Sequence, residues 1–532
     1  GGVVFMRKKF LLAGFSVFAI VGMLFAMFPQ DSQAIPPFAR KYKTACTTCH
    51  WGTFPKLNAF GNAFFNNGLR MPGGGDEVFI KDEPVEMGAS AWSKLFPKAV
   101  WPGEIPGLPP IGFKMVTNFT VTKERPHSAR GSTPGSPERE NDTEFRGIDD
   151  IEVLLGGTFG ETISFFAAGP ISEVERAHVN YTPFIFGEQG LLNVRVGKLD
   201  IRGAPISNHI RMTDFGYIMS VMPQISAGNF FGFHPNQQGI EFWGSKNGPG
   251  GKGGLEWAIG IVNGSTGDGE AWFAGAGDMG TILSNMTDTD TFSRNNAGPG
   301  AGERNNHKDW YAMVSYKLWG MGVLGEESVD DSLVAKENWQ DDSVRIKGYY
   351  YSGVTGAFID NPAVAGNFGN PFNGADGVGV WDPDANRFKR FGVLVDAYWW
   401  NFNFMAAASF MEDDISGTIT YGAGTFGATK PQETGSNFDT SIYTGEVQWV
   451  ALPWLIQTAR LENVNPDYEV RDLKSFTKYT LDTTVVLRAN MKLKAAANFS
   501  NYPDSDSDGT APVDLGGRLM DTTYQLGLDV CF

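Results

Sequence analysis

The stretch that decides the fold is Thr522-Thr523-Tyr524-Gln525-Leu526-Gly527-Leu528-Asp529-Val530-Cys531-Phe532. Its apolar side chains recur at every second position, on Tyr524, Leu526, Leu528, Val530 and Phe532. Successive side chains of an extended chain point to opposite faces, so this period predicts a β-strand with one apolar face and one polar or small-residue face.

The same alternation recurs from Ile111 onward, in segments of about ten residues separated by turns rich in Gly, Asn, Asp and Pro. Sixteen such segments can be counted, near residues 111–122, 148–159, 162–171, 174–186, 191–201, 236–246, 253–264, 307–320, 343–354, 386–400, 401–413, 439–453, 455–465, 475–490, 491–502 and 522–532. An even number of alternating segments is typical of a transmembrane β-barrel. We therefore predict a mainly β fold, an antiparallel barrel of about sixteen strands over residues 111–532. Fourteen or eighteen strands, or a soluble all-β sandwich, are the alternatives.

Aromatic residues lie at the ends of these segments, as the interfacial girdles of membrane proteins do. The residues are Trp310, Tyr311, Trp319, Tyr398, Trp399, Trp400, Trp449 and Trp454. The turns alternate in length, and the long connections near 202–235, 265–306, 355–385 and 414–438 are expected to be outer loops, with short turns such as 186–190 and Asn401 at the other end. Several connections are acidic, including Asp341 with Asp342 and residues 412–414, and carboxylates suit iron(II) docking, although solvated loop charge is the simpler interpretation.

Composition excludes several classes of protein. The chain has 532 residues, a net charge of −16 and 67 glycines, with 13% aromatic and 19% charged residues. The excess negative charge argues against a nucleic-acid partner and favours cations or basic partners. The chain has three cysteines, which leaves no disulfide framework once two are used by the motif described below.

The N-terminus has the pattern of an export signal. Met6-Arg7-Lys8-Lys9 forms a basic start, residues 10–28 are apolar, and Ser32-Gln33-Ala34 offers a small-residue cleavage site. We expect a signal peptide over residues 1–34 with its true start at Met6; a retained anchor is the alternative.

The motif that carries chemistry is Cys46-Thr47-Thr48-Cys49-His50. Two cysteines separated by two residues and followed by histidine form the attachment pattern of a c-type haem. On one helical turn both sulfurs can reach one porphyrin, and His50 becomes the proximal iron ligand. A zinc site would need a second cysteine pair, and the only other cysteine is Cys531. We therefore predict one covalently bound haem c, held by Cys46 and Cys49.

The flanking residues support this interpretation. Pro37 suits a helix start, and apolar residues at helical spacing from Phe38 place the motif at the end of a short helix. Pro55 follows His50 by five residues, so its carbonyl is placed to accept the imidazole N–H. A second helical pattern from Leu57 is stopped by Gly68. Met71 follows it and is the first candidate for the distal ligand; Met87 is the second, and His127, His178, His209, His234 and His307 stay open.

The stretches IPPFARKYKTACTTCH, FPKLNAFGNAFFNNGLR and EPVEMGASAWSKLFPKAVWPGEIPG, within residues 35–110, resemble the N-terminal segment of the fused monohaem cytochrome–porin proteins of bacterial outer membranes. The best-known members of this family are iron(II)-oxidising outer-membrane cytochromes. The resemblance implies a small α-helical cytochrome plug and linker over residues 35–110. The aromatic residue at the C-terminus of the chain, Phe532, resembles the terminal strand signal of outer-membrane barrels.

The resemblance also implies an oxidoreductase that passes single electrons from extracellular Fe(II), the suggested donor, to a periplasmic c-type cytochrome, with outer-membrane lipid around the barrel. Two alternatives stay open: export of electrons to an extracellular acceptor, and a solute porin gated by a haem plug. The chain contains no arrangement of residues typical of acid–base or nucleophilic catalysis, so no catalytic residue is predicted.

Overall fold

A computed structural model describes residues 37–72, 110–123, 142–171, 174–185, 188–206, 236–264, 307–325, 337–359, 380–415, 437–467, 475–501 and 522–531, with short pieces at 85–86, 94–95, 98, 104–105, 212–213, 216–221 and 233. The expected signal peptide, Met87, His127, His209, His234 and Phe532 lie outside these residues. Among the described helices, none is long and apolar enough to cross a membrane.

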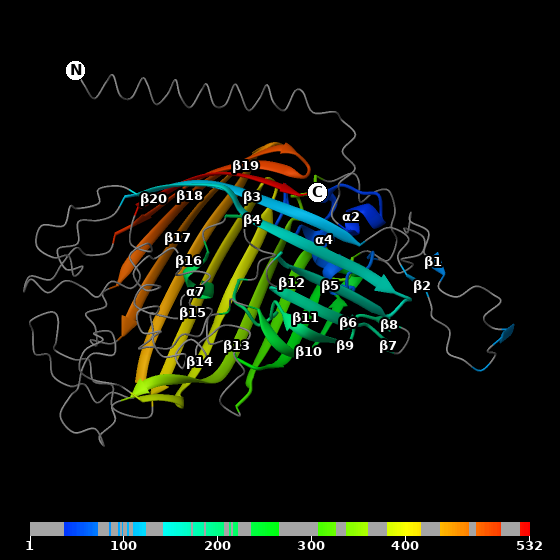
Figure 1. The fold of residues 1–532 in the computed structure, drawn as a ribbon, viewed down its shortest axis with the longest axis horizontal. Coiled ribbons are helices and arrows are strands. Elements are labelled where there is room, and N and C mark those ends of the chain that lie inside the picture. The colour runs from blue at the N-terminus through cyan, green and yellow to red at the C-terminus, as the bar shows by residue number, and fades with distance from the viewer. Residues whose placement is uncertain are drawn as a thin grey trace, which may run out of the picture.

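Sixteen strands form a closed antiparallel barrel, in which β20 pairs with β3 and β9 pairs with β10 (Figure 1). The strands are β3 (Ile111–Lys123), β4 (Asp142–Phe159), β5 (Ile163–Pro170), β6 (Arg176–Tyr181), β9 (Asn193–Leu199), β10 (Gln237–Asn247), β11 (Lys252–Val262), β12 (Asp309–Met321), β13 (Ser343–Ile359), β14 (Val380–Trp399), β15 (Phe402–Ile415), β16 (Asn437–Leu452), β17 (Leu455–Asp467), β18 (Phe476–Arg488), β19 (Met491–Ser500) and β20 (Thr522–Cys531). The predicted strand number is confirmed.

Small elements complete the described chain. Strands β1 (Val85–Glu86) and β2 (Glu104–Ile105) form one two-stranded sheet, and β7 (Phe184–Ile185) with β8 (Glu188–Gln189) forms another. A 3₁₀ turn, η1 (Pro249–Gly251), lies between β10 and β11. Strand β7 lies at the end of the segment predicted as a strand at 174–186, and β8 lies within the turn predicted at 186–190.

Alternate residues of each strand face outward and are apolar. Leu526 on β20 and Leu481 on β18 are 44% and 53% exposed, whereas Asp529 on β20 and Asp482 on β18 are buried. An apolar outer face and a polar interior are the pattern of a barrel that faces lipid. Trp310, Trp319, Trp399, Trp400, Trp449 and Trp454 are exposed, as the predicted girdles require.

The prediction of an interfacial position was wrong for two of the aromatic residues. Tyr311 is fully buried and donates to Glu241 at 2.5 Å inside the barrel. Tyr398 packs beside Trp51 of the N-terminal segment. The physical reason is the strand period: neighbours such as Trp310 and Tyr311 point to opposite faces, so only one of each pair can meet lipid.

Buried ion pairs line the interior of the barrel. Arg195 lies 2.8 Å from Glu241, Arg390 lies 2.9 Å from Asp413, and Lys494 lies 2.8 Å from Asp529, with every one of these side chains less than 5% exposed. Charges far from bulk water need partners at this distance. The polar side chains of the strands therefore pair with one another and form the polar inner wall of the barrel.

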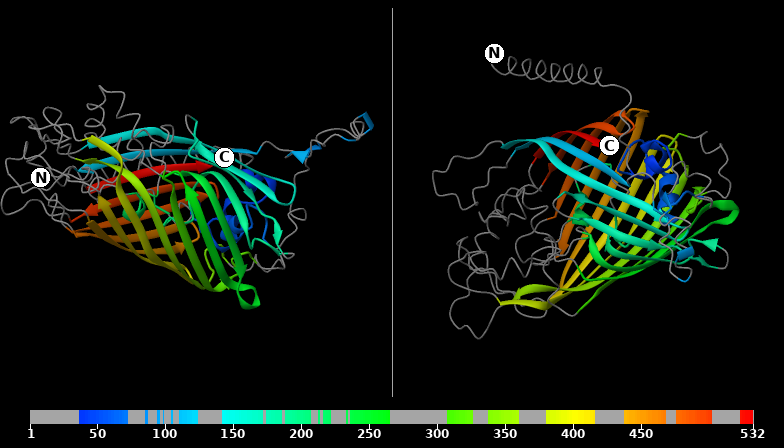
Figure 2. Two further views of the ribbon diagram at one scale, coloured as in Figure 1. Left: turned by 90° about the horizontal axis from the view of Figure 1, so that it is seen from below. Right: turned by 45° about the vertical axis from the view of Figure 1, so that its right-hand side comes forward.

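Three short helices form the N-terminal plug, which we define as residues 37–72: α2 (Pro37–Lys41), α3 (Cys46–Cys49) and α4 (Ala59–Asn66). Helices α2 and α4 lie at the same end of the barrel as the C-terminus in Figure 1, and Figure 2 shows the same arrangement from two other sides. The expected single helix is broken, because Lys43 adopts a φ of 50° and divides α2 from α3. Helix α2 begins at Pro37, as predicted.

A second segment fills the interior. The described residues between β9 and β10 (200–206, 212–213, 216–221 and 233), here the inward segment, include helix α7 (Ile218–Val221). Ile206, Ile218 and Met219 pack against lumen side chains of β14 to β18, and Ile201 and Phe233 pack against those of β11 to β14. The prediction that 202–235 is an outer loop was wrong for these residues, because their apolar side chains are buried in the lumen.

The other differences concern boundaries. Strand β4 begins at Asp142, six residues earlier than predicted at 148, and β13 and β14 extend to Ile359 and from Val380. The predicted connection at 355–385 is shortened accordingly. These extensions lie beyond the apolar stretches that a lipid-facing period can detect.

Candidate functional site

The haem motif lies in the plug on a single helical turn. Helix α3 spans Cys46–Cys49, so the two thiols predicted to bind one porphyrin stand on one turn. Both cysteines are free. Cys531 of β20 lies in the neighbourhood of Cys46. The sequence did not predict that the motif comes near the last strand of the barrel.

His50 follows directly and its ring orientation is fixed. The Nδ1 atom lies 3.1 Å from the carbonyl oxygen of Pro55 and 3.3 Å from that of Lys56. A carbonyl can only accept, so Nδ1 carries the proton and the lone pair of Nε2 is left for a metal. The Pro55 contact is the one that the spacing predicts.

Burial lowers the pKa of His50 to about 4. The two carbonyl contacts act in the opposite direction and raise the pKa, but the effect of burial is larger. The imidazole is therefore neutral at pH 7, which is the form that binds iron. Burial raises the pKa of Cys46, and burial with the nearby Cys46 raises the pKa of Cys49 to about 12. A redox dithiol needs a lowered thiol pKa, so these values argue against that alternative.

The residues present fit a covalent haem c. Two protonated thiols on one turn and a neutral imidazole with a fixed Nδ1 are the donor set that such a group requires. Within the described residues, no cluster of three or more His, Cys, Asp or Glu side chains is arranged to hold a bare metal ion.

Helix α4 packs against the haem motif. The Asn58 side chain accepts from the Gly61 N–H at 2.8 Å and so caps the helix, and its amide donates to the Thr48 carbonyl at 3.0 Å. An ideal Cβ on Gly61 would lie 2.0 Å from the Cys49 carbonyl oxygen. Only glycine at position 61 allows α4 to lie this close to α3.

The barrel wall holds the plug through residues that sequence reasoning missed. Lys56 donates to Asn403 at 2.6 Å and to Gln448 at 2.9 Å, and Lys492 donates to the Phe54 carbonyl at 2.7 Å. A lysine in an otherwise apolar turn gives no local signal of its partner. Gln448 and Lys492 do, however, stand at polar positions of the alternating pattern of their strands, and both are buried.

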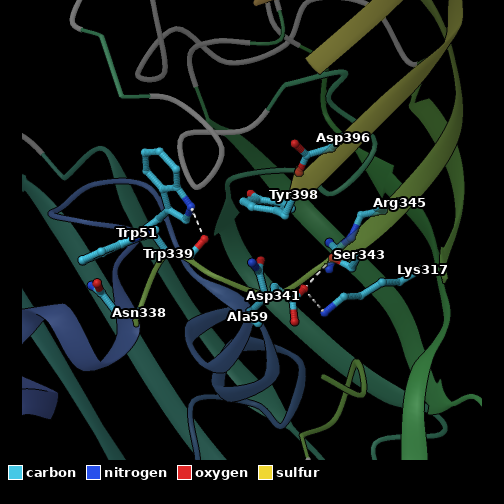
Figure 3. A pocket seen from close by; sticks show the side chains of 11 residues that line it. Trp51, Ala59, Lys317, Asn338, Trp339, Asp341, Ser343, Arg345, Asp396 and Tyr398 are labelled. Atoms are coloured by element: carbon cyan, nitrogen blue, oxygen red, sulfur yellow. Dashed lines mark hydrogen bonds and ion pairs between the residues drawn. The ribbon is translucent and has the colours of Figure 1, made fainter. Parts of the chain in front are cut away.

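A polar pocket lies between the plug and the wall (Figure 3). Trp51 donates to the Trp339 carbonyl at 3.0 Å, and Lys317 pairs with Asp341 at 2.7 Å. Asn338, which also lines the pocket, donates to the His50 carbonyl at 2.7 Å. The segment between β12 and β13 therefore covers the backbone side of the haem motif.

Two candidates for the distal ligand fall near one apolar cluster. Met71 is half-buried and packs against Tyr42, Phe64 and Leu69, and Phe166 packs on the same cluster. His178 of β6 is buried beside Phe166, at 5.9 Å between ring centroids. His307 is exposed ahead of β12, at the end of the barrel that carries the long connections. Met71 stays the first candidate.

The acidic positions proposed as an iron surface are partly internal. Asp341 is buried against Lys317, and Asp413 is buried against Arg390. Both are members of structural ion pairs, so the prediction of a solvated or docking carboxylate was wrong for them. Glu412 remains exposed and pairs with Lys389 at 3.2 Å.

Comparison with known proteins adds the following. No protein-family model matches the chain, and no curated protein matches it. Among solved structures, an anion-selective porin from Comamonas acidovorans shares 10% identity over 79% of this chain and 98% of its own, with a TM-score of 0.43. OmpF of Salmonella typhi in complex with daunomycin shares 11% identity over 79% and 97%, with a TM-score of 0.42. OmpT of Vibrio cholerae shares 8% identity over 79% and 97%, with a TM-score of 0.41.

The closed strand order, the apolar outer face and the polar lumen decide the class of protein. The chain is an outer-membrane β-barrel. The plug and the inward segment both pack against the inner wall of its lumen.

Proposed function

We propose that this barrel passes single electrons through one covalent haem c, between an extracellular donor, Fe(II), and a periplasmic cytochrome. The observation that carries the proposal is the geometry of His50, whose Nδ1 is tied to the Pro55 carbonyl at 3.1 Å beside two thiols on one turn. The identity of the donor rests on the family resemblance of residues 35–110.

Each residue of the motif has a defined task in this proposal. Cys46 and Cys49 would hold the porphyrin, and the Nε2 atom of His50 would ligate its iron. Pro55 and Lys56 orient the imidazole through their carbonyls. The bound haem supplies one-electron exchange at its iron, a reaction that needs no acid or base from the protein.

The surrounding barrel insulates the motif from lipid. A hydrocarbon core of about 30 Å is too thick for one haem to cross alone, so in this proposal the barrel gives a small external donor a route to a haem held near the other end. Two chain segments pack against the inner wall of the lumen. A solute porin gated by a haem plug stays the second candidate, and channel conductance that persists with the plug in place would support it.

The first prediction tests the haem and its donor together. Detergent-solubilised protein should carry a covalent haem, which a Cys46→Ser/Cys49→Ser double variant should lose completely while keeping its barrel. Oxidised wild type mixed with Fe(II) should show rapid haem reduction in its absorption spectrum, and a redox titration should give a positive midpoint potential. Absence of covalent haem from the wild type would refute the proposal. A strongly negative potential without reduction by Fe(II) would remove iron as the donor.

A further inference from the structure

The loop that orients His50 is the starting point. Residues 51–57, here the support loop, provide both carbonyls that contact the His50 Nδ1 atom. The loop closes on itself, because the Trp51 N–H donates to the Lys56 carbonyl at 2.8 Å and His50 pairs with Leu57. Whatever fixes this loop therefore fixes the plane of the imidazole.

Lys56 anchors one side of the support loop in the wall of β15 and β16. Its side chain is fully buried, and its ammonium donates to Asn403 and Gln448. Asn403 in turn donates to Asp396 at 2.5 Å, and Gln448 donates to Glu446. Two neutral amides thus connect one buried cation to two carboxylates, which stabilises the charge without direct ion pairing.

The Lys56 ammonium also lies over two aromatic rings. Its Nζ is 4.7 Å from the centroid of Trp51 and 5.1 Å from that of Tyr398. The Trp51 ring belongs to the support loop and the Tyr398 ring to the barrel, so the ammonium contacts both the plug and the wall through cation–π interactions.

Lys492 of β19 provides a second anchor for the support loop. This lysine is 1% exposed, donates to the Phe54 carbonyl at 2.7 Å and lies 4.6 Å above the Phe54 ring. Asp529 of β20 balances its charge at 3.4 Å. The hydrogen bond from Lys492 therefore fixes Phe54, which directly precedes Pro55, and the carbonyl of Pro55 contacts His50.

We propose that Lys56 and Lys492 are positioning residues that hold the support loop at two points and so set the orientation of the His50 imidazole toward a bound haem. This inference rests on the proposed function. It gives the barrel a second task besides insulation: the wall itself determines the geometry of the proximal ligand.

The experiment compares Lys56→Gln and Lys492→Gln with a matched control, Lys347→Gln. Lys347 is also a buried lysine of the wall whose ammonium donates to a backbone carbonyl, that of Ala204 in the inward segment. Haem-loaded proteins are measured by electron paramagnetic resonance, whose g-values follow the plane of the axial imidazole, and by redox titration. Amide hydrogen exchange over residues 51–57 is measured on the same samples.

Both test variants should shift the g-values and the midpoint potential and exchange about tenfold faster or more over residues 51–57, because each loses a charge-assisted bond. Lys347→Gln should leave all three unchanged, and Lys492→Arg, which keeps the donor, should restore wild-type values. Unchanged haem signals in folded, haem-loaded Lys492→Gln would overturn the inference, as would equal shifts in the control. A wild type without haem would refute the proposed function alone, and the exchange data would then decide whether the two lysines hold the loop.

Discussion

At the scale of single residues, Gly61 sets the distance between the haem motif and the helix below it. A Cβ at this position would meet the Cys49 carbonyl at 2.0 Å, so Gly61→Ala must push α3 and α4 apart. Overpacking of this kind costs about 1–3 kcal/mol. We expect a lower fraction of barrels with covalent haem and a lower midpoint of thermal unfolding for the plug.

The matched control for this substitution is Gly445→Ala on β16, where an added Cβ meets nothing within 4 Å. Haem content is measured from the pyridine haemochrome spectrum against protein concentration, and plug unfolding from near-ultraviolet circular dichroism. If Gly61→Ala matched Gly445→Ala in both, close packing of α4 on α3 would not matter for the site.

The residues of the motif could be predicted because their chemistry depends on spacing along the chain. Cys46, Cys49, His50 and Pro55 lie within ten positions, and the structure brings the His50 ring to the Pro55 carbonyl. The residues that support them could not be predicted in the same way. Lys56 reaches Asn403 across 347 positions, and Lys492 reaches Phe54 across 438. Pairings over such distances are set by barrel closure, which local pattern does not encode.

At the scale of elements, period-2 alternation identified all sixteen strands because each strand separates lipid from lumen. The same reasoning failed for the inward segment. Long connections of a barrel are expected outside the membrane, but Ile206, Ile218 and Met219 are less than 3% exposed within the lumen. An apolar connection in an otherwise polar set of loops was the available signal.

The inward segment is also joined to the plug. Arg202 donates to Asn66 of α4 at 2.9 Å and lies 4.2 Å from the ring centroids of Phe65 and Trp243. Met212 packs in one apolar cluster with Trp51. The plug and the inward segment therefore contact each other as well as the wall.

This packing predicts the effect of a charge in helix α7. Ile218 is fully buried, and its N–H donates to Glu462 at 2.6 Å, so Ile218→Asp would place a second carboxylate beside the first. An unpaired buried charge costs several kcal/mol. We expect residues 216–221 to exchange their amide hydrogens about tenfold faster or more, with Ile218→Val close to wild type. Equal protection in all three proteins would show that α7 does not depend on apolar burial.

At the scale of the whole molecule, the plug gives the barrel two unlike ends. Helices α2 and α4 lie at the end of the barrel that holds the C-terminus (Figures 1 and 2), and Lys56 of the plug contacts Asn403 beside the short turn at Asn401. The ends of β11 and β12 that flank the long connection 265–306 are at the opposite end of these strands. The haem motif therefore stands at the end that faces the periplasm if the barrel has the usual orientation, with short turns inside and long loops outside.

This asymmetry predicts sided electron transfer. In proteoliposomes with the barrel in one orientation, a soluble c-type cytochrome should exchange electrons with the haem about tenfold faster or more from the short-turn side than from the loop side, because electron transfer requires close approach. Orientation is established by protease protection, and rates are read from haem absorbance after rapid mixing. A small donor such as Fe(II) provides the comparison from the loop side. Equal rates for the protein partner from both sides would contradict a haem held at one end, and would require the plug to be accessible through the lumen.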